Sequence, residues 1–219
     1  MGKPGDWADA GVAAGAMRQR QINCGKGIKE MDCYELELLG VRRKLPLIPI
    51  DREMAYASFV ILGDVELISR AGKELAGRMK EVDYLVTAEA KGIPLSYEMS
   101  REMGLKEYIV LRKSVKTYMR DPLCEVVKSI TTKESQHLYL DEKDAEKIKG
   151  KSVCIVDDVI STGESLKAIE KLVKRAGADV KYKVCILAEG QAADRDDIIF
   201  LEKLPIFQRS GAQGYLPCL

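Results

Sequence analysis

Short apolar runs alternate with segments of helical periodicity between residues 64 and 187, and this alternation limits the fold more than any other feature. Strands are expected at residues 82–87, 107–111, 137–140, 152–156 and 180–187. Helices are expected at residues 64–79, with Asp64 as the cap, and at residues 94–103 and 164–176. Because strands that alternate with helices form parallel sheets covered on both faces, we predict an α/β fold with a parallel twisted sheet flanked by helices.

The segments on either side of this alternation predict a smaller lobe. Strand-like pieces occur at residues 34–39, 45–50 and 57–62, and the prolines of the middle piece place it at a sheet edge or in a loop. We expect residues 28–63 and 189–219 to form this lobe together, and residues 64–188 to form the core. Residues 1–27 contain six glycines and no sustained periodicity, which predicts a flexible extension.

Composition excludes several classes of function. The 219 residues include 35 Lys+Arg and 34 Asp+Glu, so the net charge of +1 does not suit a protein that binds duplex nucleic acid by bulk charge. The single histidine, His137, excludes two-histidine metal motifs. Six cysteines form no CxxC pair, which favours a reducing, cytoplasmic compartment. We expect no membrane segment and no signal peptide, because no apolar stretch approaches about 18 residues.

A ligand site is predicted where the strand at 152–156 gives way to the helix at 164–176. Asp157 and Asp158 follow the strand, and a short polar loop then opens the helix. The loop residues are Ser161, Thr162, Gly163, Glu164 and Ser165. Ligands of open α/β sheets bind at the carboxyl ends of strands, and backbone N–H groups at a helix start bind phosphate. The two carboxylates can accept hydrogen bonds from sugar hydroxyls, although a simple capped turn is the alternative for any Asp-Asp pair.

The same stretch closely resembles the phosphoribosyl-pyrophosphate (PRPP) signature of the type I phosphoribosyltransferases. That signature has four apolar residues, two acids, two apolar residues, a small residue, Thr, Gly, any residue, and Ser or Thr; Glu164 stands where many members have glycine. The resemblance covers about residues 64–190 and implies the type I phosphoribosyltransferase fold, with the small lobe as its hood. It also implies that Asp157 and Asp158 bind the ribose hydroxyls and that residues 161–165 bind the 5′-phosphate.

Two further segments resemble the pyrophosphate-binding parts of this family. Residues 87–94 are similar to the Glu-Ala-Arg-Gly segment of adenine phosphoribosyltransferases, with Lys91 in place of Arg, and a strained peptide is typical there, at Ala90–Lys91 in this chain. Arg112 and Lys113 resemble the basic pair that faces pyrophosphate. The resemblance implies a pyrophosphate site of Glu89, Ala90, Lys91, Gly92, Arg112, Lys113 and Lys116, and it implies catalytic roles for Arg112, Lys113, Asp157 and Asp158.

The polar segment at 114–136 resembles the mobile loop that covers the site in this family. Six basic and two acidic residues lie between positions 112 and 133, so a loop with a net charge of +4 would cover a polyanion. After the loop, adenine members carry a glutamate proposed to handle the purine proton, and Tyr139 or Asp141 falls at its place here. The lone His137 is more typical of a structural role.

The base pocket is the least specified part of the sequence. Its expected lining residues are Ile48, Ile50, Val159, Ile160, Glu189 and Phe207. These positions combine an apolar hood with few polar groups, which suits a flat heteroaromatic ring. They do not identify the base.

The resemblance implies an enzyme of purine salvage. It would join a purine base, of the adenine or xanthine/hypoxanthine type, to PRPP, giving a nucleoside 5′-monophosphate and pyrophosphate. Mg²⁺ would be held mainly through PRPP, with Asp157 and Asp158 as candidate protein ligands. We expect a homodimer and no nucleic-acid or membrane partner. The alternatives are an orotate or pyrimidine phosphoribosyltransferase and a non-catalytic, PRPP-sensing regulator of the purine repressor type, which the short, weakly charged segment before the core disfavours.

Overall fold

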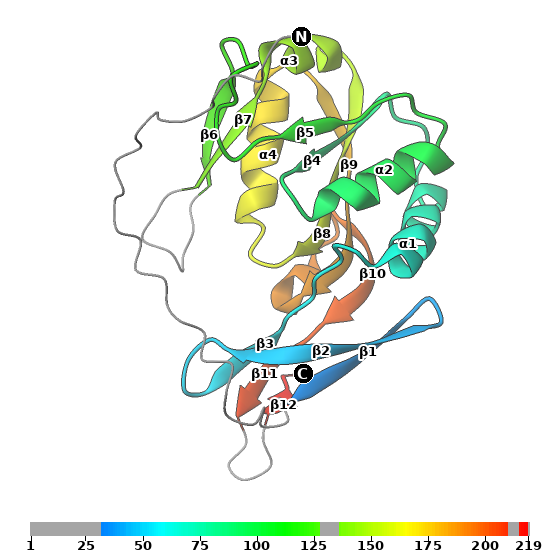
Figure 1. Cartoon of the computed structure of the whole chain (residues 1–219), viewed down its shortest axis with the longest axis vertical. Helices are drawn as coiled ribbons and strands as arrows, with labels where there is room; N and C mark the ends of the chain where they lie inside the picture. The colour runs from blue at the N-terminus through cyan, green and yellow to red at the C-terminus, as the bar shows by residue number, and fades with distance from the viewer. Residues whose placement is uncertain (1–31, 128–135, 210–214, 219) are drawn as a thin grey trace, which may run out of the picture. The chain divides into compact units, whose positions relative to one another are not determined.

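The computed structural model describes residues 32–127, 136–209 and 215–218. The extension expected at residues 1–27 and residues 128–135 of the expected mobile loop lie outside this part of the chain. Within the described residues, two five-stranded sheets and one two-stranded sheet form the framework, and four α-helices pack on it (Figure 1).

The core sheet is parallel throughout, with the strand order β10-β9-β8-β4-β5. Its strands, in chain order, are β4 (Tyr84–Ala88), β5 (Ile109–Leu111), β8 (Ser152–Ile160), β9 (Asp179–Glu189) and β10 (Ile199–Leu204). The helices are α1 (Val65–Gly77), α2 (Gly92–Glu102), α3 (Glu142–Ile148) and α4 (Glu164–Arg175), with a short 3₁₀ turn at Gly190–Asp194. The α/β fold with a parallel sheet is therefore confirmed.

Helices cover both faces of this sheet because its side chains alternate. Cys154 and Val156 of β8 join the apolar core under α1 and α2, whereas Val153 and Ile155 join the core under α4. Asp64 caps α1 as expected, since its carboxylate accepts a hydrogen bond from the backbone N–H of Leu67 at 3.1 Å.

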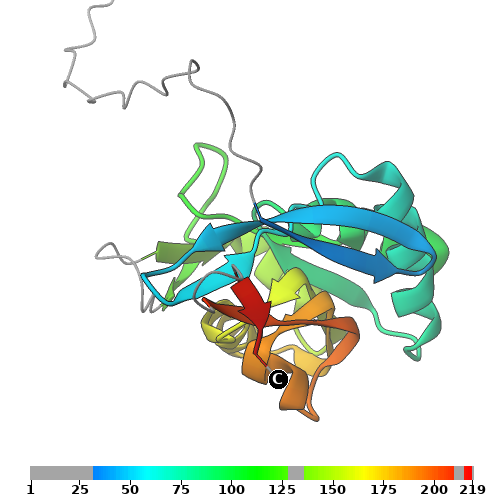
Figure 2. The same ribbon diagram turned by 90° about the horizontal axis from the view of Figure 1, so that it is seen from below.

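A second, antiparallel sheet forms the hood lobe, with the order β1-β2-β3-β11-β12 (Figure 2). Its strands are β1 (Cys33–Leu38), β2 (Val41–Pro49), β3 (Met54–Ala57), β11 (Ile206–Arg209) and β12 (Tyr215–Pro217). A separate hairpin pairs β6 (Leu123–Val127) with β7 (Gln136–Leu140).

The hood and the core share one apolar cluster. Leu36 of β1 and Leu45 of β2 are buried in the same cluster as Leu67 of α1. A bidentate ion pair adds to this contact, since Arg43 of β2 donates to both carboxylate oxygens of Asp64 at 2.7 and 2.9 Å. The hood is therefore packed directly on the helix that begins the core.

Strand β2 corrects the expectation that its prolines mark a sheet edge. The strand lies between β1 and β3, but its two halves pair on opposite sides: Val41–Pro46 with β1 and Leu47–Pro49 with β3. Each half of β2 therefore pairs mainly with one neighbouring strand. A proline, which has no N–H to donate, is tolerated there although β2 lies between two strands of the sheet.

Three other features differ from what the sequence predicts, and one core strand falls in the range expected for the hood. The strand expected at 57–62 is not formed, because pairing ends at Ala57 and the segment beyond it buries Phe59 and Ile61 without a partner strand. The polar segment at 114–136 contains β6, and α3 was not expected. The expected hood range 189–219 includes β10, which pairs in parallel with β9 in the core sheet.

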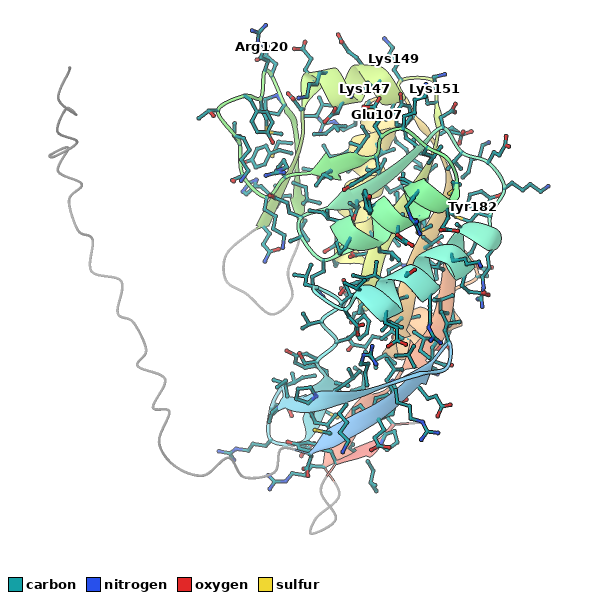
Figure 3. All side chains as sticks on the ribbon, turned by 45° about the vertical axis from the view of Figure 1, so that its right-hand side comes forward. Glu107, Arg120, Lys147, Lys149, Lys151 and Tyr182 are labelled. Carbon is teal, nitrogen blue, oxygen red and sulfur yellow. The ribbon has the colours of Figure 1, made fainter. Side chains whose placement is uncertain are left out.

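At the amino ends of the core strands, charged side chains are paired with one another. Lys147 of α3 contacts Glu107 at 2.6 Å, and Lys151 lies 3.8 Å from Asp83; Lys147, Glu107 and Lys151 are labelled in Figure 3. No helix in the described part of the chain is both long and apolar enough to cross a membrane.

Candidate active site

Asp157 and Asp158 lie inside strand β8, not after it as expected, because the strand continues to Ile160. The two carboxyl groups are close neighbours, but they make different contacts. Asp157 lines a pocket with the loop that precedes α4, and Asp158 reaches Lys91 at the start of α2. The two acids therefore occupy two halves of the site.

The Asp157 carboxyl group is held in an unusual environment. Burial, and then the charge of the neighbouring Asp158, raise the pKa of Asp157 to about 7. Its Oδ1 accepts a hydrogen bond from the backbone N–H of Asp158 at 2.9 Å.

Asp158 is almost completely buried, and its nearest cation is Lys91. The Lys91 Nζ lies 2.7 Å from Asp158 Oδ2, and the Lys91 side chain is partly exposed at the N-cap position of α2. Two elements that are 67 positions apart in the chain thus meet at one ion pair. This contact joins the sugar-binding and pyrophosphate-binding residues predicted from the sequence.

The loop between β4 and α2 approaches the sheet very closely. The Glu89–Ala90 peptide bond is cis, one residue before the unusual peptide expected at Ala90–Lys91. A Cβ atom on Gly92 would collide with Thr87 Oγ1 and would lie 3.1 Å from the Val156 carbonyl oxygen. Only glycine fits at the first residue of α2, and this close packing brings Lys91 to β8.

Glu89 organises the basic residues at the end of β5. Its Oε1 lies 2.9 Å from Arg112 Nη2, and its Oε2 accepts the backbone N–H of Lys113 at 2.7 Å. Lys116 Nζ is 4.0 Å away. This carboxylate therefore holds the Arg112 guanidinium and the backbone of Lys113 in place.

The loop before α4 has the geometry of a phosphate-binding turn. Gly163 adopts a left-handed conformation with φ of 77° and immediately precedes the first residue of α4. The loop and the end of β8 line a pocket of about 120 Å³. The Glu164 carboxylate lies 2.7 Å from Lys167 Nζ, one turn along the helix, which balances its charge. Backbone N–H groups at such a turn bind anions.

Comparison with known proteins identifies the family. A model of the phosphoribosyl transferase domain matches residues 63–208. The chain belongs to this family. The family inferred from the sequence motifs is thereby confirmed.

Curated relatives of this phosphoribosyl transferase domain include two archaeal proteins named hypoxanthine/guanine phosphoribosyltransferase. The protein from a Methanocaldococcus strain is 39% identical over 115 residues, covering 52% of this chain and 55% of the relative. The protein from Methanococcus vannielii is 42% identical over 110 residues, covering 50% of this chain and 55% of the relative. This chain thus spans about half the length of these curated relatives.

Solved structures show the same fold. An adenine phosphoribosyltransferase from Thermoanaerobacter pseudethanolicus has a TM-score of 0.59 at 22% identity, covering 73% of this chain and 95% of that chain. The Giardia lamblia enzyme complexed with 9-deazaadenine has a TM-score of 0.57 at 16% identity, covering 73% and 93%. At these identities the likeness concerns the fold, and the type I phosphoribosyltransferase fold is confirmed.

The expected base-pocket residues of the domain do not share one environment. Phe207 of β11 is 3% exposed and its ring lies 5.3 Å from the ring of Tyr34, so it is part of the hood core and is not available to a base. Ile160 is buried beside the phosphate loop, and Ile50 is exposed at the end of β2. Val159 and Ile160 line one pocket with the loop before α4, and the base pocket as a whole stays a prediction.

The residues of β7 and the start of α3 have different surroundings. Tyr139 pairs with Arg112 through two backbone hydrogen bonds of 2.8 and 2.9 Å, which places it beside the basic pair. Asp141 is buried at the start of α3 and accepts the backbone N–H of Arg120 at 3.1 Å. His137 Nδ1 lies 3.5 Å from Cys124 Sγ. Tyr139 adjoins Arg112 through the backbone, and Asp141 lines a pocket with Arg112, so the choice between these two positions stays open.

One residue near the site was absent from the predicted site. Arg195, after the 3₁₀ turn that follows β9, has its Nη1 only 2.7 Å from the position that a Cβ on Gly163 would occupy. Nothing in the local sequence relates Arg195 to Gly163, because their proximity follows from the pairing of β8 with β9.

Proposed function

We propose that this protein is a purine phosphoribosyltransferase that uses PRPP as the sugar donor. The observation that carries the proposal is the order of groups along the carboxyl edge of the core sheet. The phosphate loop after β8, the Asp157–Asp158 pair and the basic residues near β4 and β5 follow one another. PRPP presents its 5′-phosphate, ribose hydroxyls and pyrophosphate in the same order.

The reaction would be a displacement at C1′ of the ribose. A nitrogen of the base forms the new bond to C1′ and loses its proton to solvent, while the C1′–O bond breaks and its electron pair leaves with pyrophosphate. Arg112 and Lys113, which Glu89 holds in place, are suited to stabilise the charge that develops on pyrophosphate. Asp157 and Asp158 would orient the ribose through its hydroxyls, so that catalysis depends on positioning and electrostatics.

Magnesium binding fits this arrangement only if the substrate supplies most of the ligands. Asp157 and Asp158 are oxygen donors of the type that Mg²⁺ prefers, but Lys91 is already paired with Asp158. The described residues contain no group of three or more His, Cys, Asp or Glu side chains that could hold a metal ion. When bound with PRPP, Mg²⁺ would lower the charge of the pyrophosphate.

The relatives favour a 6-oxopurine as the base. The two curated relatives described above, at 39% and 42% identity, carry the name hypoxanthine/guanine phosphoribosyltransferase. The solved adenine phosphoribosyltransferases support only the fold, and they give no evidence about which base is bound. We therefore propose hypoxanthine or guanine as the preferred base, ahead of adenine.

A direct assay tests this function. The full chain is incubated with PRPP, Mg²⁺ and one base at a time from adenine, hypoxanthine, guanine, xanthine, orotate and uracil, and pyrophosphate release is measured. We expect turnover with hypoxanthine or guanine. Turnover with orotate alone would contradict the purine assignment, and PRPP binding without turnover for any base would support a PRPP-sensing regulator instead.

A further inference from the structure

The candidate phosphate loop has no positive side chain of its own. Among residues 161–165 the one ionisable side chain is Glu164, which is acidic. The nearest lysine along the chain, Lys167, is paired with Glu164 at 2.7 Å. A sugar 5′-phosphate carries a charge of about −1.5 to −2 at neutral pH, so a cation from elsewhere in the fold is expected beside it.

Arg195 is a cation that contacts this loop. Its Nη1 lies 2.7 Å from the position of a Cβ on Gly163, so a side chain at position 163 would displace the guanidinium. Strands β8 and β9 are parallel neighbours, with Ile160 opposite Ala188. The segments that follow them therefore emerge at the same edge of the sheet, and this brings Arg195 to the loop.

The Arg195 guanidinium is held in a fixed orientation. Its Nε and Nη2 donate to the two carboxylate oxygens of Asp197, each at 2.8 Å. Asp197 also accepts from Lys183 at 2.9 Å, and Lys183 lies 2.9 Å from Glu170 on α4. This chain of ion pairs connects Arg195 to the helix whose first turn forms the phosphate loop, and it leaves Nη1 on the side of Gly163.

We propose that Arg195 is a phosphate-binding residue that completes the 5′-phosphate site. In this arrangement, Nη1 donates a hydrogen bond to a phosphate oxygen, and the backbone N–H groups of the loop donate to the others. Asp197 is a positioning residue that acts through Arg195. The inference rests on the proposed function, because it requires a 5′-phosphorylated sugar in this loop.

Calorimetric titration of the full chain with ribose 5-phosphate, and separately with pyrophosphate, tests the inference. Arg195→Gln should weaken ribose 5-phosphate binding about tenfold or more, because a charge-assisted hydrogen bond is lost. Pyrophosphate, which is expected at Lys91, Arg112 and Lys113, should bind within about twofold of the wild-type affinity. Arg195→Lys should recover part of the loss.

Two further variants keep the test decisive. Asp197→Asn retains the Arg195 charge but loosens its orientation, so a smaller loss of ribose 5-phosphate affinity is expected even if Arg195→Gln folds poorly. Arg42→Gln is the matched control, because Arg42 is 80% exposed on the hood and pairs with Glu37. It should leave both affinities unchanged.

The outcomes separate this inference from the proposed function. Unchanged ribose 5-phosphate binding in Arg195→Gln would overturn the inference alone. Equal losses for both ligands, with Lys no better than Gln, would also overturn it, because they would indicate a purely structural role. Failure of the wild-type chain to bind ribose 5-phosphate would overturn the proposed function itself.

Discussion

At the scale of single residues, the two neighbouring aspartates have different surroundings and therefore different expected roles. Asp157 faces the phosphate loop and has a raised pKa, whereas Asp158 is buried against Lys91. The two side chains have different partners, because Asp158 pairs with Lys91 of the β4–α2 loop and Asp157 lines the pocket before α4. Each aspartate can therefore be tested separately.

Asp158→Asn should lower the rate of pyrophosphate release tenfold or more, which corresponds to about 1 to 2 kcal/mol of lost transition-state stabilisation. The variant loses the carboxylate that contacts Lys91 and is expected to bind the ribose hydroxyls. Steady-state kinetics with the preferred base measure the effect. Asp179→Asn, at an exposed ion pair with Lys181 at the start of β9, is the control and should keep full activity. A change of less than twofold for Asp158→Asn would contradict the assignment.

The raised pKa of Asp157 predicts how stability changes with pH. The folded chain binds this proton more tightly than the unfolded chain, in which the carboxyl group has its ordinary pKa of 3.8. The corresponding stability is fully present below about pH 4 and is lost as the pH rises through about 7. Asn cannot ionise, so Asp157→Asn should be more stable than the wild type at pH 8, by about 1 kcal/mol or more, and the difference should shrink at pH 5.

Urea denaturation at pH 5 and pH 8 measures this difference. Asp64→Asn is a control of opposite sign, because the bond to Arg43 lowers the pKa of Asp64. When folding lowers a carboxyl pKa, the resulting stability is present at pH values above the ordinary pKa and is lost on acidification. Asp64→Asn should therefore be less stable than the wild type at pH 8. A pH-independent effect of Asp157→Asn would contradict the raised pKa.

At the scale of elements, the site depends on how closely α2 approaches the core sheet. Gly92 lies against Thr87 of β4 and the Val156 carbonyl of β8, and the adjacent Lys91 reaches Asp158. The helix start thus connects two strands that are not consecutive in the sequence. A change in this packing should affect both stability and the site.

Gly92→Ala should lower the free energy of unfolding by about 1 to 3 kcal/mol, because the new methyl group has no room. It should also reduce activity, since α2 would move away from the sheet and carry Lys91 with it. Gly77→Ala is the matched control, because a Cβ on Gly77 of α1 would have no atom within 4 Å. Urea denaturation of both variants, together with the pyrophosphate assay, checks the prediction. Equal stability of the two variants would contradict it.

At the scale of the whole molecule, the hood and the core should unfold together. Leu36 of the hood and Leu67 of the core are buried in one apolar cluster, and Arg43 joins β2 to the start of α1. The described residues thus have no clear boundary at which the hood could separate. The division into residues 28–63 with 189–219 and residues 64–188 stays a prediction about organisation, and β10 of the core sheet crosses it.

Leu36→Ala should destabilise the protein by about 2 to 4 kcal/mol and should shift the unfolding of the core helices, although Leu36 is in the hood. Circular dichroism at a helix-sensitive wavelength during urea denaturation measures this, because the described helices lie outside the hood sheet. Leu216→Ala, at a residue 46% exposed on β12, should have little effect. An unchanged helix transition in Leu36→Ala would mean that the hood unfolds independently.

The resemblance to the type I phosphoribosyltransferases implies a homodimer, and this stays a prediction. Light scattering of the full chain should give about twice the mass of 24.4 kDa. Addition of PRPP and Mg²⁺ should leave this mass unchanged. A mass of one chain at micromolar concentration would contradict the expectation.

Local patterns in the sequence determined the class of fold and the location of the candidate phosphate loop. The alternation of strands and helices, the Asp64 cap and the loop at residues 161–165 depend on residues close together in the chain, which is why they could be predicted. The prediction of a strand at residues 57–62 was wrong, because the buried Phe59 and Ile61 give the same apolar alternation without strand pairing.

Only the tertiary structure decided which distant residues meet. The register of β8 with β9 brings Arg195 to Gly163, and the packing of Gly92 on the sheet brings Lys91 to Asp158. The pairing of β11 with β3 buries Phe207 in the hood core, where its ring packs against Tyr34. Such contacts depend on strand order and close packing, which arise from the whole chain and leave no periodic signal near the residues concerned.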